Sequence, residues 1–194
     1  MKINERKFGI DHINSANTIN NLGEVYLVQK DFTIAIGYFE HALKIFNQEF
    51  EIDHLMSANT LTDIGELYGI QGQLDQALLF HHRALSVYER QFGEGHIQSA
   101  KIIANIGKAF LSQKQFNEAI SQLEMALSIV ERYFGINHIN GSEIMKTLGM
   151  AYEDAGRQVE EKELLSRAKS IFLTTFGDDH MWTRKCREQL LYIE

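Results

Sequence analysis

The chain has 194 residues, 44% of them hydrophobic and 23% charged, with one cysteine and no proline, which excludes a disordered chain, a collagen and a disulfide-rich scaffold. Its net charge of −7 argues against nucleic acid or an anionic membrane as partner, because both favour basic proteins. No signal-peptide pattern follows Met1 and no run of about eighteen apolar residues occurs, so we expect a cytoplasmic protein.

A five-residue motif that begins with phenylalanine and ends with histidine recurs every 42 residues. It occupies residues 8–12, 50–54, 92–96, 134–138 and 176–180. A period that never slips indicates stacked copies of one supersecondary unit. We therefore expect a single array over residues 1–194, with repeats at about 11–50, 53–92, 95–134 and 137–176 and a capping helix at 179–194.

Each repeat is expected to contain two helices. In the first repeat Ala16, Ile19, Gly23 and Tyr26 follow the three-and-four spacing of one helical face, and later repeats carry small or apolar residues at most of these offsets. A polar break follows, and a second apolar stripe begins at Ala35. The sequence therefore predicts an all-α fold made of helical hairpins.

A glycine recurs in the first helix, at Gly23, Gly65, Gly107 and Gly149. Glycine costs about 1 kcal/mol of helix propensity relative to alanine, so its recurrence needs a packing reason. We expect these glycines to face alanines of the second helix and to let the two helices approach closely.

The boundary motif predicts how one helix ends and the next begins. Its glycine predicts a left-handed residue at the end of the second helix, at Gly9, Gly93, Gly135 and Gly177. Its aspartate or asparagine predicts the N-cap of the following helix, at Asp11, Asp53, Asn137 and Asp179.

The two ends of the chain also fit the repeat. Residues 1–8 align with 43–50, so we expect the chain to begin inside the tail of a second helix, as an excerpt of a longer array would. Residues 180–194 align with a first helix that no second helix follows, and Leu191 stands at the offset of the recurring glycine. We expect a polar capping helix there rather than a random cut.

These residues resemble the tetratricopeptide repeat (TPR), in the long variety of about 42 residues found in kinesin light chains and many bacterial regulatory proteins. Residues 16–23 and 42–45 are similar to the two helices of that family, and the Asp-His boundary is similar to its Asp-His-Pro, with Ile13 in place of the proline. The resemblance implies a right-handed αα-hairpin solenoid, a TPR-like superhelix of four repeats plus a C-terminal capping helix. It implies a scaffold for protein partners.

Nothing in the sequence favours an enzyme, a metal or a cofactor. The five boundary histidines stand a repeat apart, on the order of 10 Å, whereas metal ligands must converge on one ion at about 2 Å. His81 and His82 are adjacent on a helix and cannot chelate together. Cys186 lies among cations that could lower its thiol pKa, but no histidine and carboxylate are placed to serve it, so we expect an unreactive cysteine.

The resemblance implies that the first helices line a concave groove, and we expect a peptide or a partner segment to bind there. The expected peptide-binding residues are Asn17, Asn20, Asn21, Glu24, Asn59, Asp63, Glu66, Lys101, Asn105, Lys108 and Lys146, with Glu143 on the same wall. The charge of this wall changes from acidic to basic along the chain. Asn21 and Asn105 are expected to hold the peptide backbone, since an amide both donates and accepts.

The clamp with which family members hold acidic C-terminal tails would need lysine at Asn20, asparagine at Glu24 and Asp63, and arginine at Asn105, so only Lys101 matches. We expect instead a segment whose basic part faces the acidic residues and whose acidic part faces the lysines. Two alternatives remain open: a structural oligomer that self-associates through the ends of the array, and a regulatory TPR segment of a larger multidomain signalling protein.

Overall fold

The computed structural model describes residues 13–50, 54–136 and 138–193, and all regular secondary structure in these residues is helical, as predicted. The expected N-terminal helix tail and the caps Asp11, Asp53 and Asn137 lie outside the described residues. The chain divides into two compact units, residues 1–94 and 95–194, which we describe separately.

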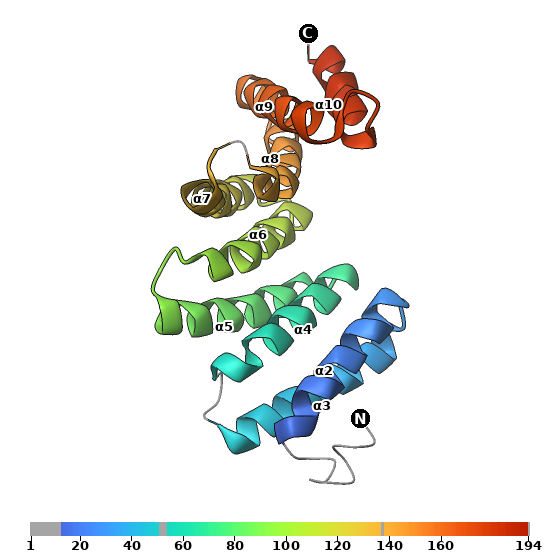
Figure 1. The fold of residues 1–194 in the computed structure, drawn as a ribbon, viewed down its shortest axis with the longest axis vertical. Helices are drawn as coiled ribbons and strands as arrows, with labels where there is room; N and C mark the ends of the chain where they lie inside the picture. Colours follow the sequence, from blue (N-terminus) through green and yellow to red (C-terminus); the bar gives the residue numbers. More distant parts are fainter. Residues whose placement is uncertain (1–12, 51–53, 137, 194) are drawn as a thin grey trace. The chain divides into compact units, whose positions relative to one another are not determined.

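The N-terminal unit consists of two helical hairpins (Figure 1). Its helices are α2 (Ile13–Val28), α3 (Phe32–Glu49), the 3-10 turn η1 (Leu55–Ser57), α4 (Ala58–Ile70) and α5 (Leu74–Phe92). Each helix packs against the next, and the first helices α2 and α4 also contact each other. The buried core includes Ala16 and Ile19 of α2 against Ala42, Ile45 and Phe46 of α3.

The C-terminal unit repeats this arrangement and adds one helix. Its helices are α6 (Ile97–Ser112), α7 (Phe116–Phe134), the 3-10 turn η2 (Ile139–Gly141), α8 (Ser142–Asp154), α9 (Gln158–Phe176) and α10 (Met181–Tyr192). The first helices α6 and α8 contact each other, and α10 packs against α9 (Figure 1). Because first helices contact first helices within each unit, residues at equivalent offsets meet on one face.

The turn within each hairpin is a Schellman motif. At the second residue after the first helix φ is positive: 64° at Lys30, 74° at Gly72, 60° at Lys114 and 71° at Gly156. The N–H of the following residue donates to the carbonyl five residues earlier, for example Gln115 to Phe110 O at 2.9 Å. Glycine adopts this backbone without strain, whereas lysine does not.

Replacing Lys114 with glycine is therefore expected to raise the free energy of unfolding by about 1 kcal/mol, because a non-glycine residue in the left-handed region costs roughly 1–2 kcal/mol. The reverse change at the equivalent site, Gly156→Lys, is expected to lower it by a similar amount. Urea denaturation measures both. Effects of the same sign in the two variants would contradict this account of the turn.

The boundary glycines adopt positive φ as predicted, 84° at Gly93, 93° at Gly135 and 87° at Gly177, with extended ψ. The predicted aspartate cap is wrong at Asp179, because the N-cap is the next residue, His180, whose Nδ1 accepts the backbone N–H of Trp182 at 3.3 Å. Histidines also cap α6 and the 3-10 turns that precede α4 and α8. These are His54, His96 and His138.

At His54, His138 and His180 the phenylalanine of the boundary motif stacks on the capping histidine, whereas the ring of His96 meets Tyr133 edge-on. The rings of Phe134 and His138 stack with centroids 5.0 Å apart, and those of Phe176 and His180 with centroids 4.4 Å apart. A stacked imidazole presents its edge, and hence Nδ1, to the free N–H groups at the start of the helix. The boundary histidines in the described residues are thus structural, as expected, and they act by capping.

Replacing His138 with alanine is expected to destabilise the C-terminal unit by about 1 kcal/mol, because it removes an N-cap acceptor. Asparagine at the same position can still accept the N–H of Asn140 and is expected to retain most of that stability. Thermal denaturation compares the two. Equal losses in both variants would mean that the ring stack, and not the cap, is what stabilises the boundary.

The recurring helix glycine does make room for the second helix, but its main contact is not an alanine. A β-carbon at Gly23 would lie 2.5 Å from the ring of Phe39, at Gly65 2.6 Å from the imidazole of His81, and at Gly107 2.7 Å from Cγ of Leu123. The large residue sixteen positions later therefore makes the nearest contact, and at Gly107 the Ala119 carbonyl lies 3.3 Å away as well.

The fourth repeat packs more loosely. A β-carbon at Gly149 would lie 3.7 Å from its nearest neighbour, Leu165, which is an ordinary van der Waals distance. At the offset where earlier repeats carry Ala35, Ala77 and Ala119, this repeat carries Glu161, whose side chain is buried. Burial, and secondarily the charge of Glu153, raise the pKa of the Glu161 carboxyl.

Because the folded state holds the Glu161 proton more tightly than the unfolded state, ionisation of Glu161 opposes folding. Its contribution to stability therefore falls as pH rises through and above the unfolded pKa of about 4.3. Glu161→Gln is expected to be about 1 kcal/mol more stable than wild type at neutral pH and to lose this advantage near pH 4. Urea denaturation across this range measures the difference. A difference independent of pH would contradict this reading.

Candidate functional site

The predicted binding residues all lie on first helices. In the N-terminal unit these are α2, which carries Asn17, Asn20, Asn21 and Glu24, and α4, which carries Asn59, Asp63 and Glu66. In the C-terminal unit they are α6, with Lys101, Asn105 and Lys108, and α8, with Lys146. We call the two sets the acidic face and the basic face.

On the acidic face, Asn20 is engaged within the protein. Its side chain is only 6% exposed. Its Oδ1 accepts from Thr60 Oγ1 at 2.7 Å, and its Nδ2 donates to Glu24 Oε1 at 3.1 Å and to Asp63 Oδ2 at 3.2 Å. Asn20 therefore links α2 to α4 and holds two carboxylates close together, instead of offering its amide to a ligand.

The remaining residues of the acidic face are more accessible. Asn17, Asn21 and Glu24 are exposed, and Asp63 and Glu66 are half-buried. Asn59 is exposed, and its Oδ1 accepts from the Tyr88 hydroxyl at 2.6 Å, which ties it to α5. Within the bounds of α2 and α4 the sequence has three carboxylates and no lysine or arginine, so this face attracts positive charge.

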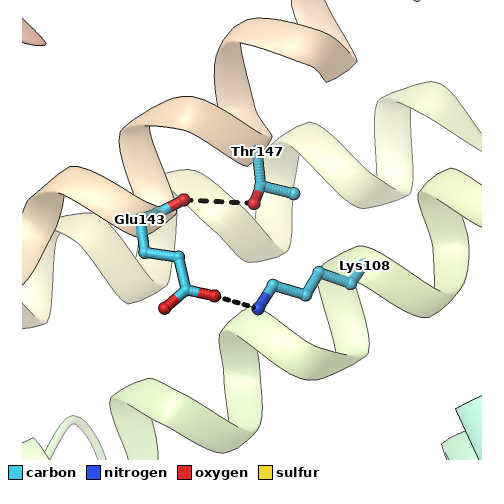
Figure 2. A network of polar contacts seen from close by, with 3 residues as sticks. All are labelled: Lys108, Glu143 and Thr147. Atoms are coloured by element: carbon cyan, nitrogen blue, oxygen red, sulfur yellow. Dashed lines mark hydrogen bonds and ion pairs between the residues drawn. The ribbon is translucent and has the colours of Figure 1, made fainter. Parts of the chain in front are cut away.

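The basic face centres on an ion pair between neighbouring first helices (Figure 2). Lys108 Nζ on α6 lies 2.9 Å from Glu143 Oε1 on α8, with the side chains 41% and 71% exposed. The hydrogen bond from Lys108, followed by the charges of Lys108, Lys146 and Lys101, lowers the pKa of the Glu143 carboxyl. One lysine thus pairs with this carboxylate, and the charges of two further lysines act on it.

Trp182 extends the basic face onto α10, and the sequence analysis, which assigned α10 a capping role, missed it. Lys146 Nζ lies 4.6 Å and Lys185 Nζ 5.6 Å from the centroid of the Trp182 ring, within the range of cation–π attraction. The ring is half-buried and stacks on Phe172 with centroids 6.1 Å apart. The one available signal was that this is the single tryptophan of the chain.

The candidate groups for chemistry have ordinary structural roles. His81 is buried against α4 whereas His82 is exposed, and no group of three metal-ligating side chains occurs among the described residues. Cys186 is buried in α10, and desolvation raises the pKa of its thiol, so the neighbouring cations do not activate it. No helix in the described part of the chain combines the length and apolarity that a membrane span requires.

The fold and its faces define a class: arrays of helical hairpins in which equivalent first helices meet. The tetratricopeptide repeat family model matches residues 14–90, 57–131 and 99–174. The chain therefore belongs to the tetratricopeptide repeat family.

Several solved structures share the fold. The putative kinesin light chain of Podosopora anserina, described as nearly identical TPR-like repeats, has a TM-score of 0.79 at 18% identity, covering 94% of this chain and 86% of that one. BtubC (BKLC) from P. vanneervenii has a TM-score of 0.76 at 18% identity, covering 99% and 84%. A Rap protein complexed with Competence and Sporulation Factor has a TM-score of 0.68 at 17% identity, covering 90% and 47%. No curated protein sequence matches the chain.

Proposed function

We propose that the protein is a non-enzymatic, cytoplasmic adaptor that binds extended segments of partner proteins on its first-helix faces. The observation that carries this proposal is the separation of charge. The charged residues on the first helices of the N-terminal unit are all carboxylates. In the C-terminal unit α6 carries two lysines and no acid, and α8 adds Lys146 beside three acidic residues. A surface that is merely solvated needs no such separation, but complementary charge orients and selects a partner.

The acidic face suits a basic stretch of a partner. Asn20 fixes the carboxylates of Glu24 and Asp63, so they need not be ordered when a lysine or arginine arrives. The exposed amide of Asn21 can pair with the partner backbone. The basic face suits an acidic stretch. The Rap protein that shares this fold forms a complex with Competence and Sporulation Factor, which supports a binding role for such an array.

The test is affinity capture with the whole chain, followed by a charge swap. Lys101→Glu with Lys108→Glu is expected to abolish binding of the captured partner, because two attractive contacts become repulsive. Lys114→Glu with Lys162→Glu, outside the two faces, is the matched control and is expected to leave affinity unchanged. Circular dichroism checks that the swapped variant remains folded. Unchanged affinity of a folded swapped variant would remove the basic face from the mechanism.

Self-association through the ends of the array stays the alternative function. Its signature is a molar mass that rises with protein concentration in light scattering, in the absence of any partner. A constant monomer mass, together with capture of a partner, favours the adaptor.

A further inference from the structure

The surroundings of Trp182 are unusual for a helix that only covers its neighbour. The backbone N–H of Trp182 donates to the His180 cap, which fixes the main chain there, and the ring stacks on Phe172, which restricts the side chain. Part of the ring remains accessible. A fixed aromatic ring with an accessible surface is typical of residues that dominate binding energy at interfaces, since little entropy is lost when a partner packs on it.

Two ammonium groups lie within cation–π distance of this ring. Lys146 of α8 and Lys185 of α10 both place their ammonium groups over or near it. The one carboxylate side chain in α10, Glu188, lies one turn beyond Lys185. Asp178 and Asp179 precede the helix, and Asp178 is paired with Arg187. On α8, Glu143 is paired with Lys108 of α6. The two ammonium groups beside the ring have N–H donors that can bind an anionic group of a ligand. An apolar group of the same ligand can then pack on the ring.

We propose that Trp182, Lys146 and Lys185 form an anchor for an acidic protein segment in which carboxylate side chains flank an apolar residue. The carboxylates bind the two lysines and the apolar side chain packs on the tryptophan ring. Helix α10 is then part of the binding surface and not solely a cover for α9. The proposal rests on the proposed function, since it supplies the anchor for the acidic stretch of the partner.

Glu143 competes with the ligand at this anchor. Its carboxylate lies among Lys101, Lys108 and Lys146 and so partly neutralises the surface that an acidic segment must approach. Removing this charge strengthens binding of an acidic segment, which is an effect that loss of structure cannot imitate.

The experiment uses the whole chain and the fluorescence of Trp182, the single tryptophan. The probe is a short peptide of glutamates around one leucine, and the reference is the same peptide with lysines. The glutamate peptide is expected to shift the emission of Trp182 to a saturable end point, and the lysine peptide is expected to leave it unchanged. Lys146→Gln with Lys185→Gln is expected to weaken binding about tenfold, and Glu143→Gln to strengthen it by roughly threefold. Lys114→Gln with Lys162→Gln is the control.

No emission change, an equal response to the lysine peptide, or unchanged affinity in the Lys146 and Lys185 double variant would overturn the anchor. The adaptor function has a separate readout. If binding of a captured partner requires Lys101 and Lys108 but does not require Lys146 and Lys185, the adaptor function stands and the anchor fails. If binding of the glutamate peptide requires Lys146 and Lys185, but no captured partner loses affinity in the Lys101→Glu and Lys108→Glu double variant, the anchor stands and the adaptor mechanism fails.

Discussion

Replacing Gly65 with leucine is expected to lower the free energy of unfolding by about 3 kcal/mol, because the helix pair has no space for the new side chain. Even a β-carbon at Gly65 would lie 2.6 Å from two atoms of the His81 imidazole, and that ring is buried. The helix must then shift or the imidazole must leave its site. Urea denaturation of the two proteins measures the loss.

Gly149 provides the matched control within the same chain. Gly149→Ala is expected to be neutral or to stabilise by up to about 1 kcal/mol, because the new methyl group meets Leu165 at an ordinary distance and alanine has the better helix propensity. Gly65→Ala is expected to be about 2 kcal/mol less favourable than Gly149→Ala. Equal effects at the two glycines would show that the contact with His81 does not limit the helix separation.

Deletion of residues 180–194 is expected to destabilise the C-terminal unit by roughly 3–6 kcal/mol and to cause aggregation that depends on protein concentration. Helix α9 packs against both α8 and α10, and its buried residues include Leu164, Leu165, Ala168, Ile171 and Phe172. Removing α10 uncovers part of this set, including the face of Phe172 that meets Trp182. Thermal denaturation and light scattering measure the two effects.

The control for this deletion is a polar replacement of the exposed end of α10. Leu191 is 67% and Tyr192 91% exposed, so Leu191→Gln with Tyr192→Gln is expected to leave stability unchanged. A deleted protein that stays monomeric and as stable as the full chain would disprove the assignment of α10 as a cover for α9.

The helices could be predicted from the sequence because the repeat multiplies a weak local signal. The spacing of Ala16, Ile19 and Tyr26 in a single repeat is compatible with several kinds of secondary structure. The recurrence of this spacing in four repeats is compatible only with stacked helical hairpins. The caps were harder to predict. Aspartate is the commoner N-cap, and the role of His180 depends on a ring stack with Phe176 that spacing alone does not reveal.

The candidate site was predictable only in outline. The sequence indicated which helices carry the polar residues and where their charge changes sign. It could not indicate that Asn20 is buried, because that depends on Thr60 and Asp63 of the next repeat. Nor could it place Lys146 beside Trp182, since the two residues lie in different repeats and meet only when α8 and α10 are brought together.

The stack of a phenylalanine on a capping histidine has a consequence for how such a chain can grow. At residues 50–54, 134–138 and 176–180 the ring and the imidazole stand four positions apart, and the cap reaches two positions further. At these three boundaries the junction is therefore encoded in about seven consecutive residues. A gene duplication with end points elsewhere in the 42-residue period copies the junction intact, so repeats can be gained or lost without new compensating changes at the splice.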